Sequence, residues 1–195
     1  KDKTGTRTLA SDSGSAWSWG ANVPKGTVVE QFASQCDESI ITVQSGTYTV
    51  ANVTGVQSLD STFTTITGSN ITYTPPSGTQ TVIYKFQFIV RPDDSNAIAH
   101  YKLFIGGTEV TEQGWNTGAE HYLATLVSFS HAFHIGGSTN NATGRQATWT
   151  SGKEIKLQAR EYGSGNEVKL HTTNLFDGGS TNRFNRPFIS ITALA

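Results

Sequence analysis

Charge is scarce in this 195-residue chain, and the few charges almost cancel. Charged residues make up 15% of the sequence, and the formal net charge is −1 at pH 7. Such a balance gives no electrostatic footprint for nucleic acid or for an anionic membrane surface. No apolar run reaches the length of a membrane-spanning helix. We therefore expect neither nucleic acid nor membrane insertion among its partners.

Cysteine is almost absent as well, and methionine is absent altogether. The single cysteine, Cys36, excludes a disulfide within the chain. We expect it to be a small buried hydrophobic residue, because a nucleophile would need a histidine and an orienting partner that the sequence does not assemble. Methionine is missing even at position 1, so we expect a fragment or a processed product of a longer polypeptide.

Catalytic motifs are missing too, since the sequence has no HExxH, GxSxG, Walker or CxxC pattern. We therefore expect a protein that is not an enzyme and that carries no cofactor. His131 and His134 are three residues apart, which places them on opposite faces of a strand, so they cannot ligate one metal within a chain. Two interpretations of His131 remain. It is a core or interface histidine, or each subunit contributes it to a metal on a threefold axis.

Strand and turn residues dominate what the sequence does contain. The stretch 73–110 reads as a ribbon of two long strands, 81–91 and 97–105, joined by a polar loop. In the first of them every second side chain is apolar and shares one face. The residues of that face are Val82, Tyr84, Phe86, Phe88 and Val90.

Helical periodicity is absent from the rest of the chain. Short strand patterns alternate with turns, which predicts an all-β sandwich or barrel of about ten strands. The other expected strands are 27–32, 39–43, 47–53, 63–66, 70–74, 122–135, 147–162, 167–173 and 188–195. Residues 1–25 have no such pattern, and we expect them to form an extended neck anchored by Trp17 and Trp19.

Several strands carry apolar residues on what should be both faces. Ile83 and Ile89 alternate with the core face of 81–91, and Ile189 and Ile191 give the last strand the same character. An apolar outer face is a liability for a soluble monomer, and burial against sister chains removes it. This pattern favours an oligomer.

Five segments in a fixed order resemble the C-terminal domains of tail-fibre proteins of marine bacteriophages. They are YTPPSGTQTVIYKFQF, HYKLFIGGTEVT, WTSGKEIKLQAREYGSGNEVKLHTT, FDGGS and the final PFISITALA. The resemblance covers residues 26–195. It implies a jelly-roll β-sandwich, similar to the tumour-necrosis-factor fold, that assembles as a homotrimer at the tip of a fibre.

The resemblance also implies a function. Residues 26–195 would be a head domain on an upstream fibre shaft in the virion, attaching to a glycan or protein of the host cell surface. Two alternatives remain open. One is a purely structural fibre or decoration domain, and the other is a fibre-borne polysaccharide-degrading enzyme.

The residues themselves suggest where such a receptor would bind. Loops on a rigid β scaffold carry function, and a tryptophan in a polar loop suits stacking on a sugar ring. Loop 111–121 is the first candidate, with 136–145 and 177–183 as secondary ones. The candidate receptor-binding residues are Trp115, Asn116, Glu120, His121, Tyr122, Asn140, Arg145 and Arg183. In the alternative interpretation Trp115 folds back as a lid on the sandwich.

Overall fold

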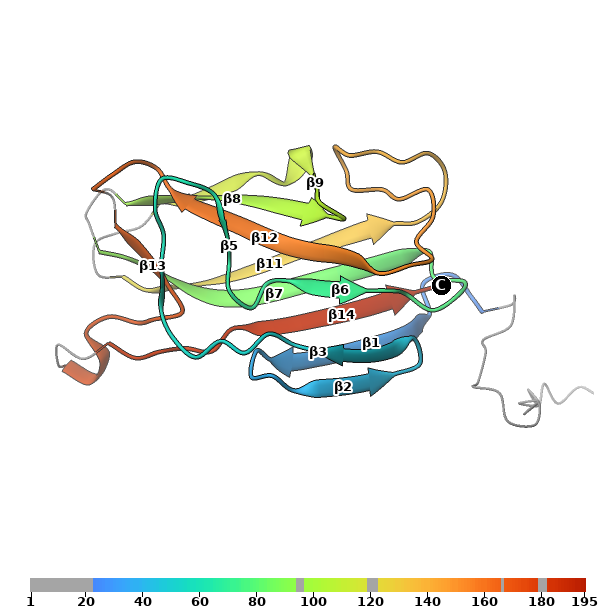
Figure 1. The fold of residues 1–195 in the computed structure, drawn as a ribbon, viewed down its shortest axis with the longest axis horizontal. Coiled ribbons are helices and arrows are strands. Elements are labelled where there is room, and N and C mark those ends of the chain that lie inside the picture. The colour runs from blue at the N-terminus through green and yellow to red at the C-terminus, as the bar shows by residue number, and fades with distance from the viewer. Residues whose placement is uncertain (1–22, 94–96, 119–122, 166, 179–181) are drawn as a thin grey trace, which may run out of the picture.

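Two antiparallel β-sheets lie face to face in the computed structural model (Figure 1). The structure describes residues 23–93, 97–118, 123–165, 167–178 and 182–195. The expected neck therefore lies outside the described residues except for its last three positions. No helix in these described ranges is long and apolar enough to cross a membrane.

The first sheet is built around β7 (Thr81–Pro92), the longest strand. It pairs with β11 along one edge and with β14 and then β13 along the other. The remaining strands of this sheet are β1 (Val28–Gln35), β4 (Gln57–Ser58), β11 (Thr125–His134), β13 (Val168–Leu170) and β14 (Phe188–Leu194).

The second sheet is built around β8 (Ile98–Ile105) and β12 (Lys153–Glu161), which pair along seven residues each. Its other strands are β5 (Thr64–Thr65), β6 (Ile71–Tyr73), β9 (Thr108–Glu109) and β10 (Trp115–Gly118). A separate hairpin, β2 (Ile40–Val43) with β3 (Gly46–Thr49), lies beside β1. Two short 3-10 turns, η1 (Thr111–Gln113) and η2 (Phe176–Gly178), complete the described elements.

The strand order is that of a jelly roll. The eight main strands form the orders β1-β14-β7-β11 and β6-β12-β8-β10. Apart from β8 and β10, which pair with each other, successive main strands cross from one sheet to the other, which is the double Greek-key arrangement. The expected all-β jelly-roll sandwich is confirmed.

The core fills the space between the sheets, as the period-two pattern predicts. The alternate residues of β7 from Val82 to Val90 are at most 2% exposed, and their neighbours on the other face are half-buried. The opposite sheet contributes Tyr101, Leu103, Ile155 and Leu157, each at most 1% exposed. Burial of this kind supplies most of the stability of a small sandwich, at about 25 cal/mol per Å² of apolar surface.

The outer face of the first sheet only partly matches the expected two-sided apolar pattern. Ile83 and Ile89 do point outward, because they alternate along β7 with the buried residues that face the core. Ile189 and Ile191 do not, since both lie opposite buried residues of β7 and are at most 1% exposed. The outward residues in the middle of β14 are polar. The period of two applies to β14 as well, so its isoleucines share a single face.

Two sequence expectations about strands are wrong. β7 and β8 follow each other in the chain but belong to different sheets, so they do not form a ribbon with each other. The expected loop 111–121 contains a strand, β10, which pairs with β8 from Trp115 opposite Tyr101 to Gly118 opposite Ile98. Asn116 and Gly118 have weak strand propensity, and pairing with a neighbouring strand overrides it.

A buried carboxylate ties the β2–β3 turn to the body of the sandwich. Glu30 is 7% exposed and accepts hydrogen bonds from the Tyr73 hydroxyl at 2.7 Å and the Ser45 backbone N–H at 2.8 Å. The Ser45 hydroxyl donates to the same carboxylate at 2.6 Å. Three donors offset the desolvation of the charge, so Glu30 is a structural anchor.

Cys36 is fully buried, as expected, and its thiol donates to the Gly68 carbonyl at 3.4 Å. Burial raises the pKa of the Cys36 thiol to about 12, so the reactive thiolate does not form near neutral pH.

The ends of the described chain meet at one end of the sandwich. The Gly26 N–H donates to the Ala195 carbonyl at 2.6 Å, next to the start of β7. At the opposite end, on the left in Figure 1, β7 and β12 end and β8 begins. We call this the loop end.

Candidate functional site

Trp115 closes the open side of the sandwich. Its indole stacks on Phe129 with ring centroids 4.6 Å apart and on Tyr101 at 4.7 Å, nearly parallel to both. Both faces of the indole are therefore covered, one by each sheet. Stacking on a sugar requires a free ring face, so the geometry matches the lid interpretation and not the sugar-stacking one.

The other residues of the first candidate loop separate into two groups. Asn116 follows Trp115 on β10, and its side chain points to the opposite, outer face of the second sheet, beside His100. Glu120, His121 and Tyr122 lie outside the described residues.

The secondary candidates lie at opposite ends of the molecule. Asn140 and Arg145 bridge each other just beyond His134, which pairs with Thr81 at the start of β7. Arg183 instead pairs with Thr173, whose carbonyl contacts Arg91 at the end of β7. Ten strand residues separate these points, a span of about 33 Å. The candidate residues therefore do not form one site.

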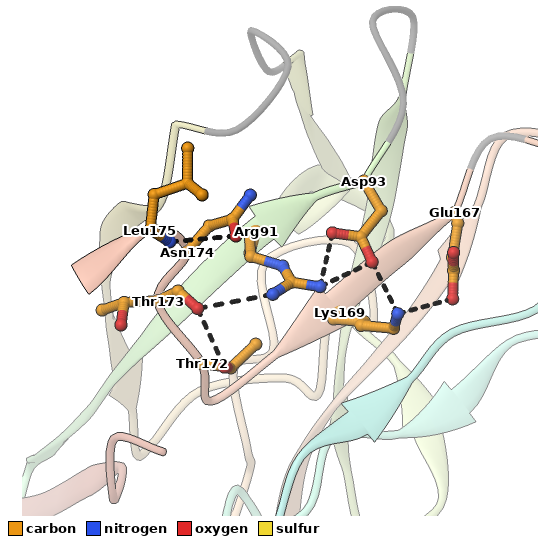
Figure 2. Close-up of polar contacts among 8 residues, drawn as sticks. All are labelled: Arg91, Asp93, Glu167, Lys169, Thr172, Thr173, Asn174 and Leu175. Atoms are coloured by element: carbon orange, nitrogen blue, oxygen red, sulfur yellow. Dashed lines mark hydrogen bonds and ion pairs between the residues drawn. The ribbon is translucent and has the colours of Figure 1, made fainter. Parts of the chain in front are cut away.

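A charged network supports the loop end (Figure 2). The Arg91 guanidinium, whose side chain is 4% exposed, pairs with the carboxylate of Asp93. Lys169 on β13 pairs with Asp93 at 2.5 Å and with Glu167 at 2.8 Å. Burial raises the pKa of Asp93, but hydrogen bonds from Lys169 and Arg91 outweigh it, so the pKa lies below its ordinary value. This network fastens the end of β7 to β13.

The same arginine holds the hairpin that leads to β14. Arg91 donates to the Thr173 carbonyl at 3.4 Å, and Thr173 exchanges backbone and side-chain bonds with Arg183. The Arg183 guanidinium lies 4.0 Å from the centre of the Phe176 ring, a cation–π contact. Arg183 is thus a surface residue at the loop end, positioned by an aromatic ring.

The outer face of the second sheet carries a different set of polar side chains. Asn116, His100 and Arg160 lie in register on three adjacent strands, β10, β8 and β12. Neighbouring strands are about 4.8 Å apart, so the three side chains form a row across the sheet. The row and three neighbours make up what we call the outer patch. Its residues are Phe63, His100, Lys102, Asn116, Arg160 and Tyr162.

Aromatic rings frame this row. Tyr162, which is 60% exposed, packs against His100 with ring centroids 5.8 Å apart. The Phe63 ring lies under two cations, with Lys102 Nζ at 4.7 Å and Arg160 Cζ at 5.3 Å from its centre. A shallow depression of about 510 Å³ opens beside the row and is lined by His100, Gly114, Trp115 and Asn116.

Most of the outer patch is not predictable from the sequence. Asn116 is a predicted site residue, whereas His100 and Arg160 only alternate with buried residues along their strands. Each is unremarkable alone, and only strand pairing places them side by side. The one early signal was the concentration of large polar and aromatic residues on the outward positions of strands 97–105 and 147–162.

His131 points between the sheets, as its register with Tyr84 requires. Its Nε2 lies 3.1 Å from the Thr143 carbonyl, and its ring packs edge-on against Phe133 at 4.6 Å. Burial lowers the pKa of His131. Within the described ranges no group of three or more His, Cys, Asp or Glu side chains could hold a metal ion. A metal shared between subunits stays an untested alternative.

Comparisons with known proteins give no family. No protein-family model matches the chain, and no curated protein matches it either. Among solved structures, one similar chain is described as "EclA C-terminal domain; sugar-binding protein". It is 12% identical, with 69% of this chain and 79% of that chain covered and a TM-score of 0.33.

Other similar structures come from infectious bursal disease virus. The T=1 particle chain is 13% identical, with 87% of this chain and 37% of that chain covered and a TM-score of 0.42. The VP2 subviral particle chain is 11% identical, with 85% and 42% covered and a TM-score of 0.36. This chain thus spans well under half the length of these viral chains. Likenesses this distant carry no conclusion about its function.

Proposed function

We propose that the chain is the tip domain of a bacteriophage tail fibre and that it attaches the virion to a carbohydrate on the host cell surface. The observation that carries this proposal is the outer patch. An amide, an imidazole and a guanidinium lie in one row on three paired strands, beside an exposed phenol and a shallow depression.

This combination suits a sugar. Amide and guanidinium groups reach ring hydroxyls, and an exposed aromatic ring packs on the apolar face of a pyranose. The supporting strands are rigid because β8 pairs on both edges, with β10 and β12. A rigid surface binds with little loss of conformational entropy.

The position of the patch supports an attachment role. The outer patch lies towards the loop end, because His100 is near the start of β8 and Arg160 is near the end of β12. The described chain begins and ends at the other end of the sandwich, where the Gly26 N–H bonds to the Ala195 carbonyl. A shaft preceding Gly26 would therefore leave the loop end and the outer patch directed away from the virion. We propose that three copies assemble in parallel on this shaft. Three weak sites on one fibre tip then bind a surface more tightly than one, through avidity.

The test is binding of the recombinant chain to a panel of bacterial cells and to an array of bacterial surface glycans. We expect Asn116→Ala combined with Tyr162→Ala to lower binding at least tenfold without changing thermal unfolding. The matched control is Arg145→Ala, an exposed change at the other end of the sandwich. Loss of binding in the control alone would move the site to loop 136–145. Sugar fragments released from a bound glycan would show instead that the chain is an enzyme.

A further inference from the structure

The cations on the outer face of the second sheet differ in how they are paired. Lys102 pairs with Glu109 at 2.9 Å, and Lys156 pairs with Glu154 at 2.7 Å. Arg160 lies on the same face, yet it makes no ion pair with any residue that the structure describes. Its charge is therefore not balanced by this part of the chain.

Neutral groups hold the Arg160 guanidinium in place. Nη1 donates to the carbonyls of Glu161 and Tyr162 at 3.4 and 3.3 Å. Nη2 faces His100 Nδ1 at 3.4 Å, and the guanidinium lies over the Phe63 ring. A guanidinium that is already oriented loses less side-chain entropy when it binds an anion.

His100 adds a donor next to this charge. Because Nδ1 accepts from Arg160, the neutral imidazole carries its proton on Nε2 and can donate from that side. Asn116 follows on the next strand with an amide that both donates and accepts. The row thus runs from the charged donor of Arg160 through the imidazole N–H of His100 to the amide of Asn116, which donates and accepts, over about 10 Å.

We propose that the outer patch binds an anionic sugar residue. This inference rests on the proposed function and specifies its ligand class. The acidic group lies on Arg160 and His100, the hydroxyls reach Asn116, and the apolar ring face packs on Tyr162. A carboxylate and a sulfate ester share this chemistry, since both accept parallel hydrogen bonds from a guanidinium.

Single-stranded nucleic acid also combines anions with stacking groups, but it needs a basic groove that follows the backbone. The chain has a net charge of −1, and both lysines on this outer face are already paired. The surface therefore favours one or a few acidic groups and not a polyanionic backbone.

The experiment measures binding of the wild-type chain to a polyuronate, to dextran sulfate and to uncharged dextran. We expect one of the two anionic polymers to bind at least tenfold more tightly than dextran, and the preferred one identifies the acidic group. Arg160→Gln should lower that affinity roughly tenfold or more, because a charge-assisted bidentate contact is lost. Arg160→Lys should recover part of it, because lysine restores the positive charge without the bidentate geometry of a guanidinium.

The matched control is Lys156→Gln, on the same strand and the same outer face but paired with Glu154. Its affinity should stay within about twofold of wild type, because a screened surface pair contributes little. Equal losses in Lys156→Gln and Arg160→Gln would show plain ion exchange and overturn the inference. Equal binding to dextran, or tighter binding to a single-stranded oligonucleotide, would overturn it too.

These outcomes separate the two proposals. If the Asn116 and Tyr162 double variant loses cell binding while the wild-type chain does not discriminate dextran from the anionic polymers, the attachment function stands and the acidic ligand fails. If the wild-type chain binds neither cells nor any glycan, both proposals fail.

Discussion

Trp115 and Phe129 stack face to face at 4.6 Å across the open side of the sandwich, one ring from each sheet. Tyr101 covers the other face of the indole. We therefore expect Trp115→Ala to destabilise the fold by about 3 kcal/mol, the usual effect of deleting a packed aromatic side chain. Chemical denaturation measures this directly.

The neighbouring Asn116→Ala is the control for that change, since Asn116 is exposed on the other face of the same strand. It should leave stability within about 0.5 kcal/mol of wild type. A Trp115→Ala protein with unchanged stability and lost glycan binding would contradict the lid role and restore the sugar-stacking one.

Asp93 neutralises an arginine that the fold has buried. Asp93→Asn should cost about 3 kcal/mol, because it leaves the charge of Arg91 without its partner in a buried site. Glu154→Gln removes a partner from an exposed pair and should cost less than about 1 kcal/mol. Urea midpoints of the two variants compare these effects, and similar values would argue against a structural role for the network.

His171 makes the fold sensitive to acid. Burial lowers its pKa from an ordinary 6.5 to about 4, and its Nδ1 is buried without a hydrogen-bond partner among the described residues. Below pH 6.5 the unfolded chain takes up a proton that the folded chain refuses, so stability falls as the pH drops towards 4. The loss from this group is about 3 kcal/mol.

Thermal unfolding between pH 7 and pH 4 tests this. His171→Asn should have a lower melting temperature but a flatter pH dependence, because asparagine does not take up a proton in this range. The variant should still fold, since asparagine tolerates the positive φ of 65° at this position. His134→Asn, an exposed change, should keep the wild-type slope. An unchanged slope in His171→Asn would assign the acid sensitivity to other groups.

Assembly is the fourth prediction. The outer face of the first sheet, formed by β7 from Thr81 to Ile89 and by the adjoining β11 and β14, carries few charges. Lys85 is the one charged side chain there if histidine is left aside, and Leu126 on the same face is 60% exposed. Such a face favours burial against sister chains. Light scattering at micromolar concentration should give three times the 21.0 kDa chain mass.

Ile83→Asp should break this assembly, because it places an unpaired carboxylate in the centre of this sparsely charged face. Gln158→Asp, on the outer face of the other sheet, is the control and should leave the mass unchanged. A monomer mass for the wild-type chain would contradict the prediction outright.

The sequence alone determined most of the strands and the core-facing side chains of β7. Alternation is a local property, so Val82 to Val90 could be placed between the sheets without knowledge of any partner strand. Cys36 could be assigned to the interior from its residue type and from the lack of partners for a nucleophile. The jelly-roll order came from a resemblance and not from periodicity, because periodicity does not say which strands pair.

Tertiary structure decided everything that depends on pairing. It made a strand of Trp115–Gly118, placed β7 and β8 in different sheets, and turned Trp115 inward between Tyr101 and Phe129. It also brought Asn116, His100 and Arg160 into one row, although they come from three distant segments. Contacts between strands far apart in sequence are set by the register of the whole sheet, and no local pattern encodes that register.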